Sequence, residues 1–129
     1  MKIVKIAALG LAAALCASNA QAAASDYEFQ AVSQEIKAGS SVELAVRLIH
    51  KPTQKPVSDA VLFRTRLDMS PENMAGMTAA IAPESSNEPG VYRFKADLSM
   101  AGQWALKLMA KAPGESETVT GTVIVKAKD

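Results

Sequence analysis

The stretch VYRFKADLSMAGQWALKLM, residues 91–109, decides the fold class. Hydrophobic and polar residues alternate through Tyr92–Ser99, and the alternation resumes over Trp104–Met109 after an Ala101-Gly102 turn. Because successive side chains of a strand point to opposite faces, this alternation is typical of strands with one face on a hydrophobic core. The stretch therefore predicts two strands joined by a short turn.

The same period of two continues on both sides of this stretch. Further strands are expected over Tyr27–Val32, Val42–Ile49, Val61–Asp68, Thr78–Ala82 and Thr118–Lys126. Turn formers such as Pro89-Gly90 separate them, and no helical period stands out in the body of the chain. About seven short strands in roughly 105 residues predict an all-β fold, an immunoglobulin-like two-sheet sandwich, with a closed barrel as the alternative.

The first 22 residues have the three parts of a secretory signal peptide. A basic start at Met1–Lys5 precedes an apolar run at Ile6–Leu15, and the small residues that signal peptidase requires follow. Cleavage is expected after Ala22 or after Ala24. The predicted organisation is a signal peptide at 1–22, an N-terminal segment with the first strand at 23–40, and a β-sandwich at 41–129 that forms one domain with that strand.

Two alternatives would keep the leader on the protein. Cys16 follows the apolar run, as in lipoproteins, but Leu15 stands where a lipidation site has a small residue. A retained anchor needs about 20 apolar residues, and this run is much shorter. The sequence therefore predicts a periplasmic protein with no direct membrane anchor.

Cleavage changes the chemistry of the 129-residue chain. It removes the only cysteine, so the mature domain has neither a disulfide nor a thiolate. Loss of Lys2 and Lys5 lowers the 14 basic residues to 12 against 13 acidic residues, a net charge of about −1. A near-neutral chain without a basic block argues against nucleic acid and against anionic lipid as ligands.

Methionine is the residue type whose placement indicates a specific chemistry. Three of the six methionines fall in the segment MSPENMAGM, residues 69–77, and Met100 stands just before the Ala101-Gly102 turn. If successive strands run in opposite directions, all four of these residues meet at one end of the sandwich, with His50 at the other end. Thioether sulfur is soft and selects Cu(I). A three- or four-coordinate Cu(I) site is therefore predicted from Met69, Met74, Met77 and Met100.

Two other roles for the methionines stay open at this point. Methionine also fills gaps in hydrophobic cores, and Met69 and Met100 are in phase with the buried faces of their strands. A methionine-rich contact with another protein is the third interpretation. Met74 and Met77 lie among polar and turn-forming residues, which predicts a surface loop.

The remaining candidates have simpler interpretations. His50, the only histidine, is typical of a strand end, and Trp104 is in phase with buried positions of its strand. Met109 falls on the outward phase. No glycine-rich phosphate loop is present, and no nucleophile has a histidine partner, so a non-enzymatic protein is expected.

Four segments occur together in a characteristic order. They are Lys55-Pro56-Val57-Ser58-Asp59-Ala60-Val61, Met69 with Met74 and Met77, Gly90-Val91-Tyr92, and Met100-Ala101-Gly102-Gln103-Trp104. Over about Ser41–Lys126 the chain resembles the YtkA-like domain, which is related to the FixH proteins. The resemblance implies an immunoglobulin-like sandwich in the periplasm or at the outer face of a membrane, and no shared catalytic residues.

The resemblance also implies a role in copper handling, heavy-metal efflux or the assembly of copper-containing oxidases. The family's methionine motif maps onto Met69, Met74, Met77 and Met100, with Met69-Ser70-Pro71 in place of the usual Met-Pro step. We therefore predict a periplasmic protein that binds Cu(I) and passes it on. The alternative is an accessory module without a metal of its own, which docks on a membrane-bound metal transporter or oxidase through the same end or an exposed sheet edge.

Overall fold

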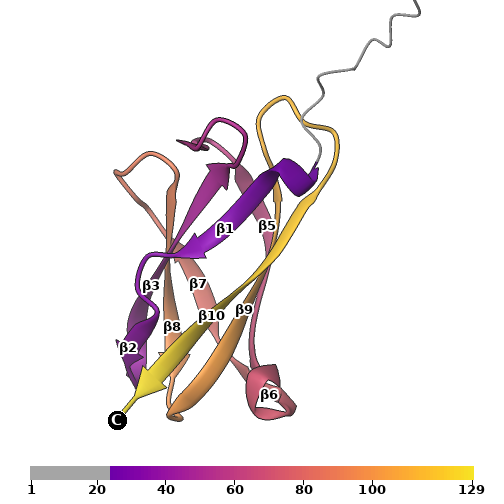
Figure 1. The fold of residues 1–129 in the computed structure, drawn as a ribbon. Helices are drawn as coiled ribbons and strands as arrows, with labels where there is room; N and C mark the ends of the chain where they lie inside the picture. Colours follow the sequence, from indigo (N-terminus) through magenta and orange to yellow (C-terminus); the bar gives the residue numbers. More distant parts are fainter. Residues whose placement is uncertain (1–23) are drawn as a thin grey trace, which may run out of the picture.

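The computed structural model describes residues 24–129, which form two β-sheets packed face to face (Figure 1). Within this range no α-helix occurs, and two single-turn 3-10 helices, η1 (Ala24–Asp26) and η2 (Ser70–Glu72), join strands. The predicted all-β, two-sheet sandwich is therefore confirmed. The predicted signal peptide, residues 1–22, lies outside the described residues.

Sheet A has the strand order β1-β3-β8-β7, and β4 pairs with the end of β3. Its strands are β1 (Tyr27–Ala31), β3 (Gly39–His50), β4 (Lys55–Pro56), β7 (Ile81–Glu84) and β8 (Val91–Leu98). All of its pairings are antiparallel. The long strands β3 and β8 supply most of its buried face.

Sheet B has the strand order β2-β10-β9-β5-β6. Its strands are β2 (Glu35–Lys37), β5 (Val61–Met69), β6 (Met74–Ala79), β9 (Gly102–Lys111) and β10 (Val119–Lys128). β2 runs parallel to β10, and the other neighbours are antiparallel. β6 pairs only with the last three residues of β5, which leaves the first two-thirds of that strand at the edge of the sheet.

One predicted strand is wrong in a way that has a physical reason. The segment expected as a single strand, Thr78–Ala82, is divided between β6, which ends at Ala79 in sheet B, and β7, which begins at Ile81 in sheet A. Alternation of hydrophobic and polar residues indicates an extended backbone, but it does not indicate which neighbouring strand the backbone amides bond to. The very short β2 and β4, neither of which has a buried side chain, also escape the pattern.

The core lies between the sheets and is built from the inward phase of the long strands. Trp104, Leu106 and Leu108 of β9 are at most 2% exposed, which confirms the predicted core position of Trp104. The other core residues are Phe29, Leu44, Val46, Leu48, Leu67, Met69, Phe94, Ala96, Leu98, Ala110, Val119, Val123, Val125 and Ala127. Burial of this apolar surface is the dominant favourable contribution to folding.

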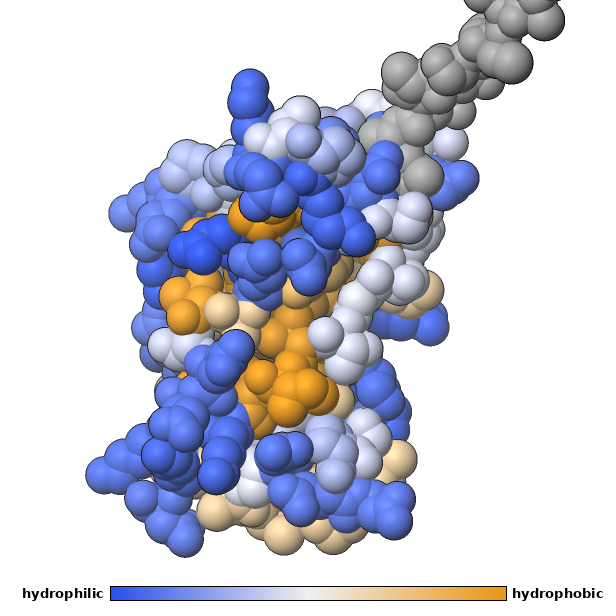
Figure 2. Space-filling model, viewed as in Figure 1, coloured by the Kyte–Doolittle hydropathy of each residue, from blue (hydrophilic) through white to orange (hydrophobic). Residues whose placement is uncertain are grey.

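Phe29 closes the side of the sandwich between β1 and β10. Its ring approaches Gly121 so closely that a Cβ there would lie 2.8 Å from Phe29 Cδ2. Beside the ring a shallow hollow of about 570 Å³ remains, with Ala31 and Val123 among its lining residues. Figure 2 shows hydrophobic surface within this depression.

Tyr92 of β8 anchors the chain that leads from β4 into β5. Its hydroxyl donates to the Val57 carbonyl oxygen at 2.6 Å and accepts from the Ala60 amide at 3.1 Å. Burial raises the pKa of the Tyr92 hydroxyl, so it stays neutral and keeps its proton for the Val57 bond.

Replacing Tyr92 by phenylalanine tests this anchor. We expect Tyr92→Phe to lower the free energy of unfolding by about 1–3 kcal/mol, because two backbone groups lose their partner while the ring stays in place. Urea denaturation measures this loss, and amide hydrogen exchange at Ala60 should accelerate. Unchanged stability together with unchanged exchange at Ala60 would contradict the anchoring role.

Candidate functional site

The four predicted ligands lie at one end of the sandwich, which we call the methionine pole. The pole consists of the end of β5, η2, the start of β6 and the turn from β8 to β9, all at the bottom of Figure 1. It forms because β5 ends where its neighbour β9 begins: Asp68 pairs with Ala105. The last residue of β3, His50, lies at the opposite end.

Met69, the last residue of β5, belongs to the core at the base of the pole. It is 1% exposed, and its methyl group lies against Gly102, where an added Cβ would be 2.9 Å from Met69 Cε. Gly102 has a φ of 136°, a conformation that favours glycine, so backbone and side chain meet there without a Cβ between them. The Met69 sulfur is thus closed off from solvent in this structure.

Met74, Met77 and Met100 are open to solvent, with exposed fractions of 37%, 42% and 38%. Met74 stands directly opposite Met69 in the β5–β6 ladder. The register then jumps, since the next pair is Asp68 with Thr78, so the residues between Met74 and Thr78 bulge out of the ladder and take Met77 with them. The segment expected to be a surface loop is therefore η2 followed by an irregular, exposed edge strand.

Met100 lies in the turn between β8 and β9, above the indole of Trp104. Its carbonyl oxygen accepts a hydrogen bond of 3.0 Å from Trp104 Nε1. Because the indole is buried, this bond holds the turn against the core. The Met100 side chain is left pointing away from the interior, as its exposure shows.

Glu72 of η2 connects the two halves of the pole. One of its carboxylate oxygens accepts a hydrogen bond of 2.8 Å from the Gln103 amide at the start of β9. Asn73, which follows, adopts a left-handed conformation with φ 63° and donates its amide to the Ser70 carbonyl at 2.9 Å. The turn that carries Met74 is therefore tied to the turn that carries Met100.

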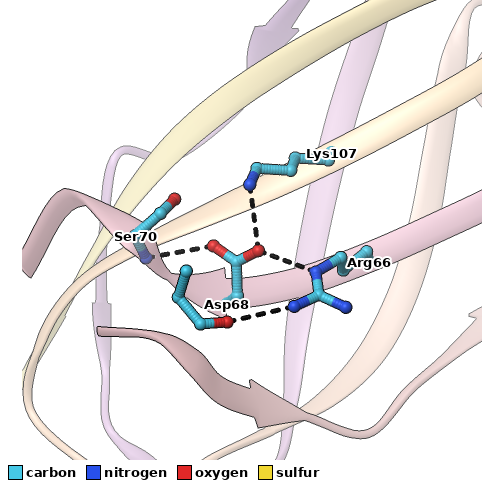
Figure 3. A network of polar contacts seen from close by, with 5 residues as sticks. Arg66, Asp68, Ser70 and Lys107 are labelled. Atoms are coloured by element: carbon cyan, nitrogen blue, oxygen red, sulfur yellow. Dashed lines mark hydrogen bonds and ion pairs between the residues drawn. The ribbon is translucent and has the colours of Figure 1, made fainter. Parts of the chain in front are cut away.

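Behind the pole lies a charged cluster that the sequence patterns do not single out (Figure 3). Asp68 has no exposed surface, and its Oδ2 accepts from Arg66 Nε at 2.8 Å and from Lys107 Nζ at 3.0 Å. Its Oδ1 accepts from the Ser70 amide at 3.0 Å. Arg66 also donates from Nη2 to the Ala75 carbonyl at 3.0 Å, which ties the bulged part of β6 to β5.

The pKa of Asp68 follows from two opposing effects. Burial alone would raise it, but hydrogen bonds from Arg66, Ser70 and Lys107 to the ionised carboxylate outweigh burial and hold the pKa well below its usual value. The two cations are about half exposed, so the carboxylate is covered by charged side chains that themselves reach water. Asp68 therefore stays ionised as the support of the pole.

The other residues considered as ligands are placed away from the pole. His50 ends β3 as predicted, its Nδ1 lies 2.8 Å from Thr53 Oγ1, and its ring lies beside that of Tyr27. Met109 is half-buried on the outer face of sheet B, opposite Arg64 and Thr120. Neither side chain contributes to the end where the four methionines gather.

Within the described part of the chain, no three His, Cys, Asp or Glu side chains come together as a metal site would require. The side chains that gather at the methionine pole are those of the four methionines. No helix among residues 24–129 is long and apolar enough to cross a membrane.

Comparisons with known proteins bear on the family and on the fold. The chain is similar to the solved ZirS C-terminal domain, with a TM-score of 0.47 and 8% identity over 100% of this chain and 85% of that one. It is also similar to the Escherichia coli adhesin FdeC, with a TM-score of 0.42 and 17% identity over 81% of this chain and 31% of that one. Both likenesses are too distant to support a functional argument.

No curated protein matches the chain significantly. A family model described as YtkA-like matches residues 21–109, which is more than half of the chain and contains the whole methionine pole. The resemblance seen in the sequence is therefore confirmed: this chain belongs to the YtkA-like family.

Proposed function

We propose that this protein is a periplasmic, non-enzymatic Cu(I)-binding protein that holds the metal through methionine thioethers at the methionine pole. One observation carries the proposal. Of the seven large hydrophobic side chains that are exposed in residues 24–129, three are Met74, Met77 and Met100, all at that one end. Leaving three such side chains in water forgoes a favourable burial, which a binding role explains.

The donor set suits Cu(I) better than other ions. Thioether sulfur is soft and uncharged, and it favours Cu(I) over the harder divalent metals. A methionine ligand has no proton to lose, so the ion can be bound and released without the acid–base change that thiolate or imidazole sites require. These properties suit a protein that passes its metal to a partner.

The backbone around the exposed methionines supports a binding role because it is held in place. Glu72 ties η2 to β9, Arg66 ties the bulged part of β6 to β5, and the Trp104 indole holds the Met100 turn. Preorganised ligands lose less conformational freedom on binding. Met69, at the base of the pole, is the fourth sulfur of the proposed set.

An anaerobic Cu(I) titration against a competing chelator tests the metal role. We expect the wild type to bind one Cu(I), and the triple variant M74L/M77L/M100L to bind at least about tenfold more weakly. Replacing even a residue that only hydrogen-bonds to a metal ligand weakens metal sites about tenfold or more. Leucine keeps the volume and removes only the sulfur. The matched control Met109→Leu, on the outer face of sheet B, should bind like the wild type.

The same titration separates the proposal from its alternative, an accessory docking module in which the exposed methionines contact another protein. Flexible, polarizable methionine side chains suit such contacts as well. Wild-type binding no tighter than that of the triple variant would refute the copper role and leave the docking role. Where the wild type does bind Cu(I), Met69→Leu tests whether the buried methionine is a ligand. A ligand is indicated by weaker binding at unchanged stability in urea denaturation, since a packing defect in the core would lower the stability as well.

A further inference from the structure

The exposed edge of sheet B is a second site, distinct from the methionine pole. β5 is paired with β9 from Val61 to Asp68, with a register shift between Leu62 and Arg64. On its other side, β6 covers only Leu67, Asp68 and Met69. In the described part of the chain, no backbone hydrogen bond joins residues 61–66 to anything other than β9. A strand with one neighbour directs the amides and carbonyls of alternate residues to its open side, where they are free to pair with another strand.

From this edge we infer that β5 accepts an added strand: an extended segment of a partner protein in which acidic and hydrophobic residues alternate. In such β-strand addition, backbone hydrogen bonds supply affinity, and pockets for alternate side chains supply specificity. The two faces of β5 differ in a way that specifies both kinds of side chain. The inference does not depend on copper binding.

The inward face offers a cavity with a hydrophobic part and a polar rim. A space of about 460 Å³ opens between β5 and the β7–β8 side of sheet A, and Leu62, Pro83 and Phe94 are among its lining residues. Three carboxylates line it: Asp59, Glu84 and Glu88. Glu84 lies 3.9 Å from Lys95 and Glu88 lies 3.1 Å from Arg93, so two of the three already have cationic partners. A hydrophobic side chain pointing inward from an added strand would enter this cavity.

The outward face offers more positive charge than its one carboxylate, Asp68, can balance. Arg64, Arg66, Lys107 and Met109 line a hollow of about 340 Å³ on the outer face of sheet B. Arg66 and Lys107 share the Asp68 carboxylate, whereas Arg64 forms no hydrogen bond or ion pair with any described residue. An acidic side chain pointing outward from the added strand would meet Arg64.

Two further observations favour a strand from a partner protein. One argues against an edge that is protected from pairing, and the other argues against pairing between two copies of this chain. Val61 and Phe63 at this edge are 62% and 52% exposed. Exposed hydrophobic residues on an open edge promote pairing with another strand, so this edge is not protected against strand addition. Antiparallel pairing of β5 with a second copy of itself would bring the Arg64 and Arg66 side chains of both chains together, and like charges opposed across a strand pair are destabilising. An added strand with acidic residues would instead place opposite charges beside Arg64 and Arg66, which is favourable.

A peptide titration of the metal-free protein tests the inference. The probe is the capped heptapeptide Thr-Glu-Leu-Glu-Leu-Glu-Thr, compared with the same peptide carrying lysine for glutamate. By amide NMR we expect the acidic peptide to shift residues 61–66 and to slow their hydrogen exchange, and the lysine peptide to bind at least about tenfold more weakly. Arg64→Glu should lower the affinity for the acidic peptide by a similar factor. The fold should survive this change because Arg64 has no partner to lose.

Arg47→Glu is the matched control, with the same charge change on the outer face of sheet A. It should leave the affinity within about twofold, since it lies far from the added strand. The inference would be overturned if Arg47→Glu lowered the affinity for the acidic peptide as much as Arg64→Glu does. It would also be overturned if the protein bound the acidic and the lysine peptide equally well. Concentration-dependent dimerisation through residues 61–66, or binding to phosphatidylglycerol vesicles without peptide binding, would overturn it as well.

Discussion

Asp68→Asn should destabilise the protein by about 2–4 kcal/mol at neutral pH, a large part of the 5–15 kcal/mol typical of a domain. Asparagine has the shape of aspartate but not its charge. Its amide nitrogen would face either the cations Arg66 and Lys107 or the Ser70 amide, so one donor would always meet another donor. For about 100 residues this loss corresponds to a fall in Tm of about 10 °C or more.

The pH dependence gives this prediction a signature that a packing effect lacks. The pKa of folded Asp68 lies below its value in the unfolded chain, which is about 3.9. The unfolded state therefore binds its proton first as the pH falls, and the stabilisation, complete above about pH 5, is lost progressively below about pH 4. The difference in unfolding free energy between wild type and Asp68→Asn should shrink between about pH 5 and pH 2.

Asp97→Asn is the matched control for Asp68. The Asp97 carboxylate is exposed on β8 and accepts one hydrogen bond, from the Ser41 amide at 2.9 Å. We expect its replacement to cost less than about 1 kcal/mol, because the asparagine oxygen can still accept this bond and solvent screens the charge of an exposed carboxylate. Urea denaturation from pH 2 to pH 7 measures both variants. An Asp68→Asn effect that does not change over this range would mean that the carboxylate is not held ionised by its partners.

Gly90→Ala is the substitution with the second large expected effect. Gly90 has a φ of 78°, and a Cβ there would lie 2.4 Å from Pro56 Cβ and 3.1 Å from Pro56 Cα. The backbone has little room to yield, since the Gly90 carbonyl accepts the Leu48 amide at 2.9 Å. We expect a loss of about 3–4 kcal/mol, of which about 1 kcal/mol comes from the left-handed conformation and the rest from the collision.

Two other glycines separate these contributions. Gly114 has a similar φ of 80° with nothing within 4 Å of an added Cβ, so Gly114→Ala should show only the conformational cost of about 1 kcal/mol. Gly76 has neither a positive φ nor a near neighbour, and Gly76→Ala should be close to neutral. If Gly90→Ala is no more destabilising than Gly114→Ala in urea denaturation, the contact with Pro56 does not constrain the fold.

The long strands could be predicted because their alternation reports burial directly. Val91–Leu98 reads as a half-buried strand in the sequence, and in β8 its alternate positions do face the core. β6 could not be predicted in the same way. None of its side chains is fully buried, and its extended backbone is held by pairing with β5 and by Arg66, so no hydrophobic pattern marks it.

The site shows the same division. The common location of the four methionines could be predicted from strand direction alone, because the ends of antiparallel neighbours meet. The burial of Met69 and the exposure of Met74 and Met77 follow the strand phase and the loop composition. Met100 does not: its phase predicts a buried side chain, but β8 ends at Leu98, and Met100 is exposed in the turn that follows. The Asp68 cluster was missed since Lys107 lies 39 residues away in the chain and comes into contact only across the β5–β9 pair.

The sequence by itself determined the fold class. It also predicts a leader whose cleavage would remove the only cysteine and leave methionine sulfur as the softest donor atom of the chain, since these inferences depend on residue type and local period. Only the tertiary structure decided that Met100 is exposed, which carboxylate supports the methionine pole, and which edge of β5 stays open. The last two depend on contacts between residues far apart in the chain. Local patterns constrain the direction in which a side chain points, but its neighbours are set by how the two sheets pack.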